Sequence, residues 1–388
     1  MSPTLIFYLC VEFIAISFLA CADSMVSETS RKLIQSGRKK FSFYNIKAYH
    51  LCFVLSFLVL FLVLGLRDHI GMDYESYIGI YSNISIFGIE ARDRNEIGFA
   101  IVCKLSDMLM PGAYELMFAV IAFLTMYFTY KAIYKMSCCW YLSLAYFIFF
   151  GYFISSMNLI RQILAMTITT YACSFLFDNE NKKTFLFYVI IAGLFHKSAY
   201  IMIPFYFFYN TRITRRNLMI YTFLLFSLNT TFMRDVIQYV VSLTRYGVYM
   251  DSMAGQIEPI NNSNVYVRLC MLAGCLIFAK RTISRNHNTL IYYNSALVCL
   301  IITIIAAITT VPIFLRLASY FFMSNMFLIP EVLKTMKSES STIYSKKFYV
   351  LLTVLLFVAY NLIGYYWKNT DQFSEGNYRM IFFSMFFS

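Results

Sequence analysis

The chain has 388 residues, of which 60% are hydrophobic and only 13% are charged, and its mean hydropathy is +0.64. This balance excludes a water-soluble globular domain, because too little polar surface remains to face water. The formal charge of +12 does not indicate nucleic acid as a partner, because Lys and Arg form short clusters between apolar runs. We therefore predict an all-α polytopic integral membrane protein with about 12 transmembrane helices in contact with a lipid bilayer.

Apolar runs follow one another along the whole chain, each long enough with its flanks to cross about 30 Å of hydrocarbon. They span residues 3–22, 48–66, 113–134, 139–156, 158–177, 184–195, 198–209, 217–234, 264–280, 288–311, 312–330 and 348–366. The first run contains Glu12 and has no basic segment before it, so we interpret it as a retained helix rather than a cleaved signal. The two runs beside His196 are short and predict a broken or re-entrant hairpin.

The basic clusters fall in alternate loops, which assigns those loops to the cytoplasm. The opposite side receives two large loops, residues 67–112 and 235–263, and most of the acidic residues. Within the first loop, residues 96–109 alternate apolar and polar side chains at helical spacing, which predicts an amphipathic helix at the membrane interface. Ten cysteines show neither a disulfide framework nor zinc spacing.

Arginine and histidine side chains gather at the non-cytoplasmic ends of the predicted helices. An intramembrane cation costs several kcal/mol unless it faces a cavity or an anion, so such residues are functional candidates. Guanidinium groups suit phosphate oxygens, which favours a lipid-linked phosphate or diphosphate as the ligand. The acids of the loops above would then bind or deprotonate a sugar hydroxyl. The cations concerned are Arg67, Arg161, His196, Arg268 and Arg316.

Each candidate also has a structural interpretation. Arg161 could snorkel to the interface, His196 could be satisfied by the backbone of a turn, and Arg316 could pair with an acid in a helix contact. Asp73 could cap the helix after the loop, and Glu96 could be a solvated charge or a helix N-terminal acid. These alternatives stay open at the level of the sequence.

Four segments resemble, in order and spacing, the EpsG-like branch of the O-antigen polymerase (Wzy) superfamily. They read LRDHIGMDYESYIGIYSN, NEIGFAIVCKLSD, MNLIRQILAM and FHKSAYIMIPFYF, and they cover most of residues 60–210; the later RLASYF is also similar. The resemblance implies a GT-C-like fold and a bacterial inner-membrane enzyme. Such an enzyme joins undecaprenyl-diphosphate-linked repeat units on the periplasmic face, for O-antigen, capsule or exopolysaccharide, without a cofactor and alongside a chain-length regulator protein.

The resemblance also implies roles for individual residues. It makes Arg67, Arg161 and Arg316 the expected diphosphate ligands and Asp73, Glu96 and His196 the expected catalytic residues. We add Arg268 to the expected diphosphate ligands because of its place at a helix end. His196 would donate a hydrogen bond to phosphate or shuttle a proton. Asp73 or Glu96 would take the proton of the attacking hydroxyl, and the motifs do not decide between them. Asp73 and Glu75 could hold a divalent cation, but the polymerase family is thought to work without metal, so we expect none.

Three other functions compete with a polymerase. A flippase would also have a cationic cavity, but transporters usually show internal repeats and broken helices, and the chain has only 14 Gly and 6 Pro. An O-antigen ligase shares the substrate and the architecture. An acyltransferase that uses His196 as base should draw its acyl donor from the cytoplasmic side, whereas the predicted topology places His196 outside. The ordered motifs favour the polymerase.

Overall fold

The computed structural model describes most of the chain in several stretches. These are residues 3–27, 30–31, 48–92, 96–177, 181–212, 214, 216–217, 239, 263–309, 313–338, 351 and 355. Across these residues the chain is helical and contains no β-strand. Almost all residues of the predicted spans 217–234 and 348–366 and of the predicted second loop 235–263 lie outside the described residues.

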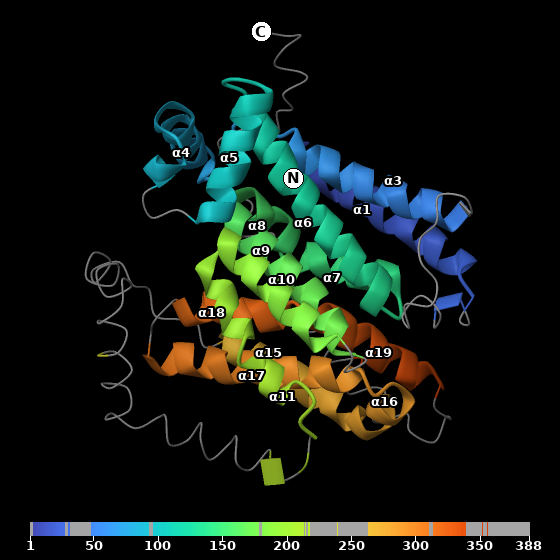
Figure 1. The fold of residues 1–388 in the computed structure, drawn as a ribbon. Coiled ribbons are helices and arrows are strands. Elements are labelled where there is room, and N and C mark those ends of the chain that lie inside the picture. Colours follow the sequence, from blue (N-terminus) through green and yellow to red (C-terminus); the bar gives the residue numbers. More distant parts are fainter. Residues whose placement is uncertain are drawn as a thin grey trace. The chain divides into compact units, whose positions relative to one another are not determined.

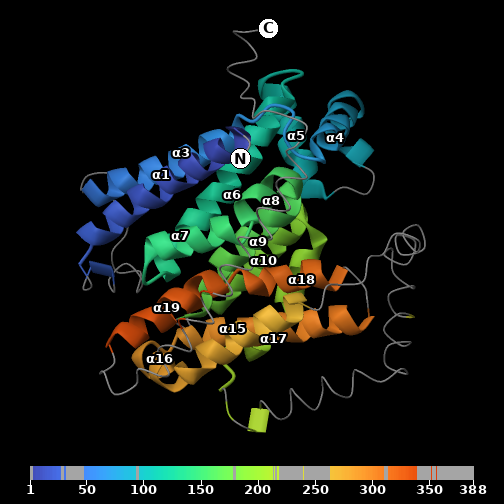
Figure 2. The same cartoon turned by 180° about the vertical axis from the view of Figure 1, so that it is seen from behind.

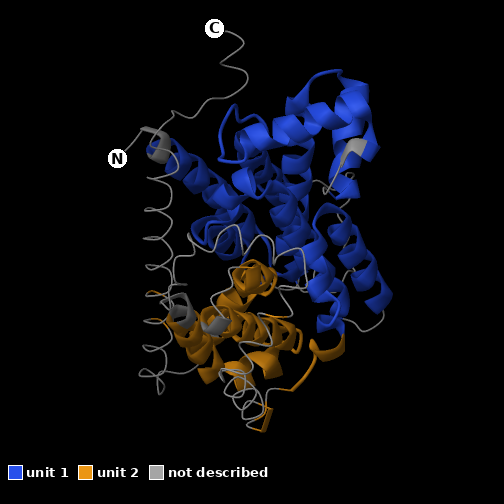
Figure 3. Ribbon diagram, turned by 90° about the vertical axis from the view of Figure 1, so that its left-hand side faces the viewer, with its two compact units in different colours: residues 1–206, 358–388 blue, residues 207–357 orange. Residues whose placement is uncertain are grey.

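The chain forms two compact units, residues 1–206 with 358–388 and residues 207–357, which Figure 3 colours blue and orange. The expectation of one transmembrane domain stays a prediction, because units that pack separately can share one membrane. The helices of the first unit are α1 (Pro3–Met25), α3 (Ala48–Gly65), α4 (Tyr74–Phe87), η2 (Ile89–Arg92), α5 (Ile97–Leu109), α6 (Tyr114–Met136), α7 (Trp140–Phe149), α8 (Tyr152–Asn158), α9 (Ile160–Ala172), η3 (Cys173–Leu176), α10 (Lys182–Phe195) and η4 (Lys197–Met202). The short helix α11 (Phe205–Phe208) follows at the boundary of the two units.

Four helices are long and apolar enough to cross a membrane, namely most of α1, all of α3 and α6, and Thr289–Ala307 of the second unit. Two bent pairs could each form one more span: α7 with α8, bent by 49°, and Ile313–Phe322 with Asn325–Lys337, bent by 43°. The described residues therefore hold four to six candidate spans, as a polytopic membrane protein requires. The number of about 12 helices and the GT-C-like fold stay predictions.

Helix α9 lies in the middle of the first unit, beside α6, α8 and α10 (Figures 1 and 2). Every residue of α9 is buried except Arg161. Two of its threonines satisfy their hydroxyls within the helix, since Thr167 and Thr169 donate to the carbonyls three residues earlier. A helix buried on all sides cannot turn Arg161 toward lipid without moving its whole surroundings, so the guanidinium has to find its partners inside the protein.

The first helices are joined by polar contacts as well as apolar packing. The Ser56 hydroxyl of α3 donates to the Ala15 carbonyl of α1 at 2.7 Å and lies 2.7 Å from the Tyr130 hydroxyl of α6. Small and hydroxyl side chains let transmembrane helices approach closely and hydrogen-bond across the interface. These contacts hold α1, α3 and α6 together as one layer beside α9.

The two ends of the first unit differ in charge. Helix α3 ends and α6 begins at the end that carries α4 and α5, and both α8 and α10 end there. At the other end α6 finishes and α10 begins, and basic residues collect there: Lys131 over the Tyr171 ring, Lys135 over the Phe175 ring, and Lys182 in the first turn of α10. We refer to these as the α5 end and the basic end.

The second unit is also helical. It consists of α15 (Ser263–Ile277), α16 (Ala279–Arg285), α17 (Thr289–Thr309), α18 (Ile313–Phe322) and α19 (Asn325–Ser338). Helix α17 packs against α15, α18 and α19. The Tyr293 hydroxyl of α17 donates to the Cys275 carbonyl at 2.8 Å, and the Ser295 hydroxyl donates to the Phe321 carbonyl at 3.0 Å. These bonds fix α17 as the central helix of this unit.

Candidate functional site

Three sequence-predicted residues meet at the α5 end of the first unit. Glu96 precedes the first turn of α5, Arg161 is the second residue of α9, and His196 follows the last residue of α10. Arg161 Nη1 donates to Glu96 Oε2 at 2.5 Å, and His196 Nδ1 lies 3.2 Å from Glu96 Oε1. Each oxygen of one carboxylate therefore faces a different nitrogen-bearing side chain. We call these three residues the Glu96 triad.

The electrostatics of the Glu96 triad favour an ionised carboxylate. The Glu96 side chain is 9% exposed, against 21% for Arg161 and 25% for His196. Burial by itself raises the pKa of Glu96, but the contact with His196 and the charge of Arg161 outweigh burial and hold that pKa below its ordinary value. At neutral pH the carboxylate thus compensates the charge of a partly buried arginine, which is costly to leave alone.

Two aromatic rings lie beside the guanidinium of Arg161. Its Cζ atom lies 5.7 Å from the ring centre of Tyr77 on α4 and 5.5 Å from that of Phe99 on α5. Both rings are buried, and a cation over an aromatic face is attracted by the ring quadrupole. Burial raises the pKa of Tyr77, so its hydroxyl stays protonated. Sequence reasoning missed both rings, although both fall within the segments that carry the family resemblance.

Asp73 does not belong to the Glu96 triad and is linked to it through Tyr77, whose ring lies near Arg161. It immediately precedes α4, its side chain makes no capping hydrogen bond, and its carbonyl accepts from the Tyr77 amide one turn later. The neighbouring acid Glu75 is paired with His69, whose Nδ1 lies 2.5 Å from Glu75 Oε1. Among the residues that the structure describes, no three His, Cys, Asp or Glu side chains come together as a metal site.

Arg67 occupies a different environment from Arg161. It is 1% exposed, and its guanidinium donates to the backbone carbonyls of Leu64, Ile70 and Met157. Its Cζ atom also lies 4.8 Å from the ring centre of Phe118. The side chain is thus directed at the protein's own backbone, and it ties the loop before Asp73 to the end of α8.

The two remaining arginines belong to the second unit. Arg268 on α15 is half-buried, and its Nη1 donates to the Thr303 hydroxyl of α17 at 2.5 Å while its Cζ lies 4.5 Å from the ring centre of Phe322. Arg316 is exposed on α18. The expectation that these two residues bind the same diphosphate as Arg161 stays a prediction.

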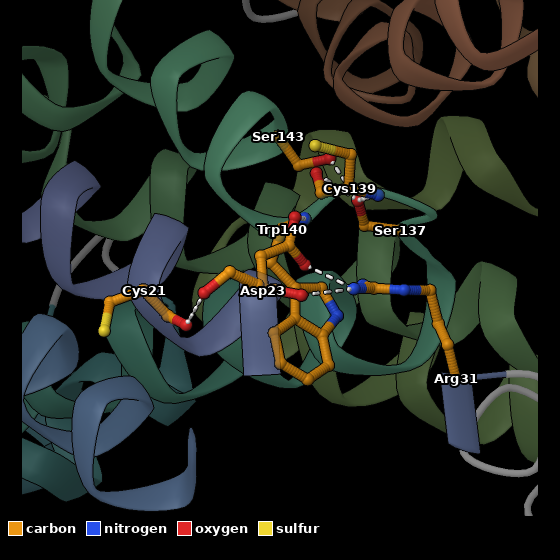
Figure 4. A network of polar contacts seen from close by, with 8 residues as sticks. Cys21, Asp23, Arg31, Ser137, Cys139, Trp140 and Ser143 are labelled. Carbon is orange, nitrogen blue, oxygen red and sulfur yellow. Dashed lines mark hydrogen bonds and ion pairs between the residues drawn. The ribbon is translucent and has the colours of Figure 1, made fainter. Parts of the chain in front are cut away.

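A second polar cluster lies at the basic end of the first unit (Figure 4). Asp23, in the last turn of α1, accepts a hydrogen bond of 2.6 Å from Arg31 Nη2 and one of 3.2 Å from the Trp140 amide. The guanidinium of Arg31 stacks 4.7 Å from the centre of the Trp140 ring. These contacts join the end of α1 to the start of α7. The signal available in the sequence was an acid at the end of an apolar run with an arginine eight residues later.

The sequence that forms the Glu96 triad can be compared with known protein families. The model of the EpsG family matches residues 50–375, which is most of the chain. The chain belongs to the EpsG family. EpsG-like proteins are part of the Wzy-like polymerase group, so the resemblance drawn from the four segments is confirmed. The match includes all three residues of the triad and indicates a membrane protein of the polysaccharide polymerase type. No curated protein and no solved structure matches the chain.

Proposed function

We propose that this EpsG-family protein is an inverting membrane glycosyltransferase that joins undecaprenyl-diphosphate-linked repeat units on the extracytoplasmic face of a bacterial inner membrane. The observation that carries the proposal is the Glu96 triad, in which a partly buried arginine and a histidine share one carboxylate at one end of a membrane-helix bundle. The donor is a glycan on its lipid diphosphate. The acceptor is the non-reducing end of another lipid-linked unit.

The distribution of charge supports the proposed side of the membrane. Lys131, Lys135 and Lys182 lie at the basic end of the first unit, and positively charged ends of membrane helices usually face the cytoplasm. The triad lies at the opposite end. A diphosphate head group at that depth has its lipid tail in the outer leaflet and its sugars in the aqueous phase.

Arg161 stabilises the leaving group in this mechanism. As the bond between the anomeric carbon and the phosphate oxygen breaks, its electron pair leaves with the undecaprenyl diphosphate and negative charge builds on that oxygen. A guanidinium held by Glu96 beside the Tyr77 and Phe99 rings is a preorganised donor for this charge, and such donors contribute most in a site from which water is excluded. His196 donates a further hydrogen bond to the same phosphate.

Asp73 accepts the proton of the attacking hydroxyl. A carboxylate whose pKa is held low by two neighbours is a poor base, and Glu96 is in that position, so we assign to Glu96 the holding of Arg161 and His196. Asp73 makes no capping hydrogen bond and precedes by one turn the tyrosine that contacts Arg161. As the new bond between the hydroxyl oxygen and the anomeric carbon forms, the hydroxyl proton passes to Asp73.

The experiment is the ladder of surface glycans made by a deletion strain that carries each variant. We expect Arg161→Ala and Asp73→Asn to reduce long polysaccharide to products with a single repeat, at wild-type amounts of protein. Arg281→Ala, which removes an exposed arginine of α16, is the matched control and should leave the ladder unchanged. A full ladder from Arg161→Ala refutes the mechanism. A deletion strain that attaches no repeat at all indicates a ligase or a flippase.

A further inference from the structure

Two glycines lie where the three segments of the Glu96 triad meet. Gly98 is buried in the first turn of α5, two residues after Glu96. A Cβ atom added to Gly98 would lie 2.9 Å from the Leu194 carbonyl oxygen and 3.0 Å from its carbonyl carbon. Both are backbone atoms in the last turn of α10, two residues before His196. The start of α5 therefore touches the end of α10 at a place that has no room for a side chain.

Gly193 allows a similarly close contact between α10 and η4, the helix that follows His196 in the chain. It is buried in α10, and a Cβ atom there would lie 2.3 Å from two carbons of the Tyr200 ring. Tyr200 belongs to η4, which begins directly after His196. The backbone at His196 is extended, with its amide bonded to the Ala192 carbonyl and its carbonyl to the Ala199 amide. Gly193 thus lets η4 fold back over the last turn of α10.

We propose that Gly98 and Gly193 are positioning residues that set the distance between Glu96 and His196. The proposal rests on the proposed function of the Glu96 triad and adds what holds it together. Gly98 fixes the height of Glu96 against α10, and Gly193 with Tyr200 fixes the turn that presents His196. Close approach is not general for glycines of this protein, because a Cβ atom at Gly79 of α4 would meet nothing within 4 Å.

The two glycines differ in what a methyl group would strike. At Gly98 the obstacle is backbone, which cannot rotate away. Gly98→Ala therefore has to move α5 away from α10, which increases the distance between Glu96 and His196. At Gly193 the obstacle is a ring that is 40% exposed, which a second substitution can remove. Tyr200→Ala should therefore rescue Gly193→Ala. Leu194→Ala should not rescue Gly98→Ala, because it leaves the carbonyl in place.

The test measures the coupling between Glu96 and His196 in purified full-length protein. A double-mutant cycle of Glu96→Gln and His196→Gln gives the part of the melting-temperature shift that is not additive. We expect this non-additive shift to be measurable in the wild-type background and in the Gly79→Ala background, and to be absent in the Gly98→Ala background. We also expect at least a tenfold loss of long polysaccharide in Gly98→Ala and Gly193→Ala, and its return in Gly193→Ala with Tyr200→Ala.

The outcomes separate this inference from the proposed function. An unchanged coupling in Gly98→Ala overturns the positioning role even if Arg161→Ala abolishes polymerisation. A full ladder from Arg161→Ala overturns the proposed function, while the cycle still reports what holds the triad. If Gly98→Ala does not fold, the Gly193 and Tyr200 variants test the inference instead. The inference is refuted if Tyr200→Ala fails to restore the coupling between Glu96 and His196 in Gly193→Ala.

Discussion

At the scale of single residues, one carboxylate organises the candidate site. Glu96 contacts Arg161 and His196, which are far from it in the sequence, and its ionised form compensates the charge of Arg161. The sequence predicted that Arg161 and His196 matter, because the cost of a cation in an apolar run is a local property. It did not predict that Glu96 joins them, because a contact across 65 residues depends on how α5 and α9 pack.

Acid should remove part of the stability that Glu96 supplies. Because the folded pKa of Glu96 lies below its ordinary value of 4.5, its contribution is present above about pH 4.5 and is lost as the pH falls through the lower folded pKa. Glu96→Gln leaves Arg161 uncompensated and should cost about 3 kcal/mol at neutral pH. The measurement is the melting temperature in detergent from neutral to acidic pH.

The pH dependence of the Glu96→Gln variant serves as the control. The variant cannot ionise at this position, so its melting temperature should fall less on acidification than that of the wild-type protein. Parallel curves for the two proteins would show that the stabilising carboxylate is another one. Asp107 has to be kept intact in both, because hydrogen bonds from Ser85 and the Gly112 amide also lower its pKa.

At the scale of the elements, the loop between α3 and α4 is built around backbone groups rather than side-chain packing. Arg67 donates to three carbonyls, and the Met72 amide donates to Asn158 Oδ1 at 2.7 Å. The sequence predicted a helix over residues 96–109, which the structure confirms as α5, and a break at His196, which separates α10 from η4. The structural use of Arg67 was not predictable, because a motif does not show which carbonyls surround a side chain.

Gly71→Ala should destabilise this loop more than Gly88→Ala destabilises the end of α4. Both glycines have positive φ, 118° and 81°, in backbone conformations that L residues rarely adopt, so each alanine costs about 1–3 kcal/mol of backbone strain. Only at Gly71 would the added Cβ also lie 2.7 Å from the Met157 carbonyl oxygen, which adds about 1–3 kcal/mol of overpacking. Thermal unfolding of both variants measures the difference. Equal losses would contradict the close contact at Gly71.

At the scale of the whole molecule, composition alone predicted an all-helical membrane protein, because hydropathy is a sum over long segments and does not depend on tertiary contacts. The described residues contain four to six candidate spans, and nearly all residues of two further predicted spans lie outside them, so the number of about 12 helices stays a prediction. The Asp23, Arg31 and Trp140 cluster was not predicted, since Asp23 stands alone at the end of an apolar run. Its environment comes from α7, more than a hundred residues away.

The predicted topology can be tested with single engineered cysteines. Met72 is 75% exposed at the α5 end, and Lys183 is exposed at the basic end. In intact spheroplasts a membrane-impermeant maleimide should label Met72→Cys, and it should label Lys183→Cys only after lysis. The parent protein with its ten native cysteines gives the background. The reverse pattern would place the Glu96 triad in the cytoplasm and contradict the proposed donor.

The pairing of Glu96 with Arg161 also bears on selectivity. A tethered carboxylate acts as an internal counter-ion, held beside the guanidinium at a high effective concentration. Chloride or free phosphate is dilute in the surrounding medium, and it would have to displace this tethered carboxylate in order to bind Arg161. An anion anchored in the bilayer is itself concentrated at the same depth and competes on better terms. Under the proposed function, the pairing would thus keep Arg161 from binding ordinary electrolytes and leave it available to an anion on a lipid.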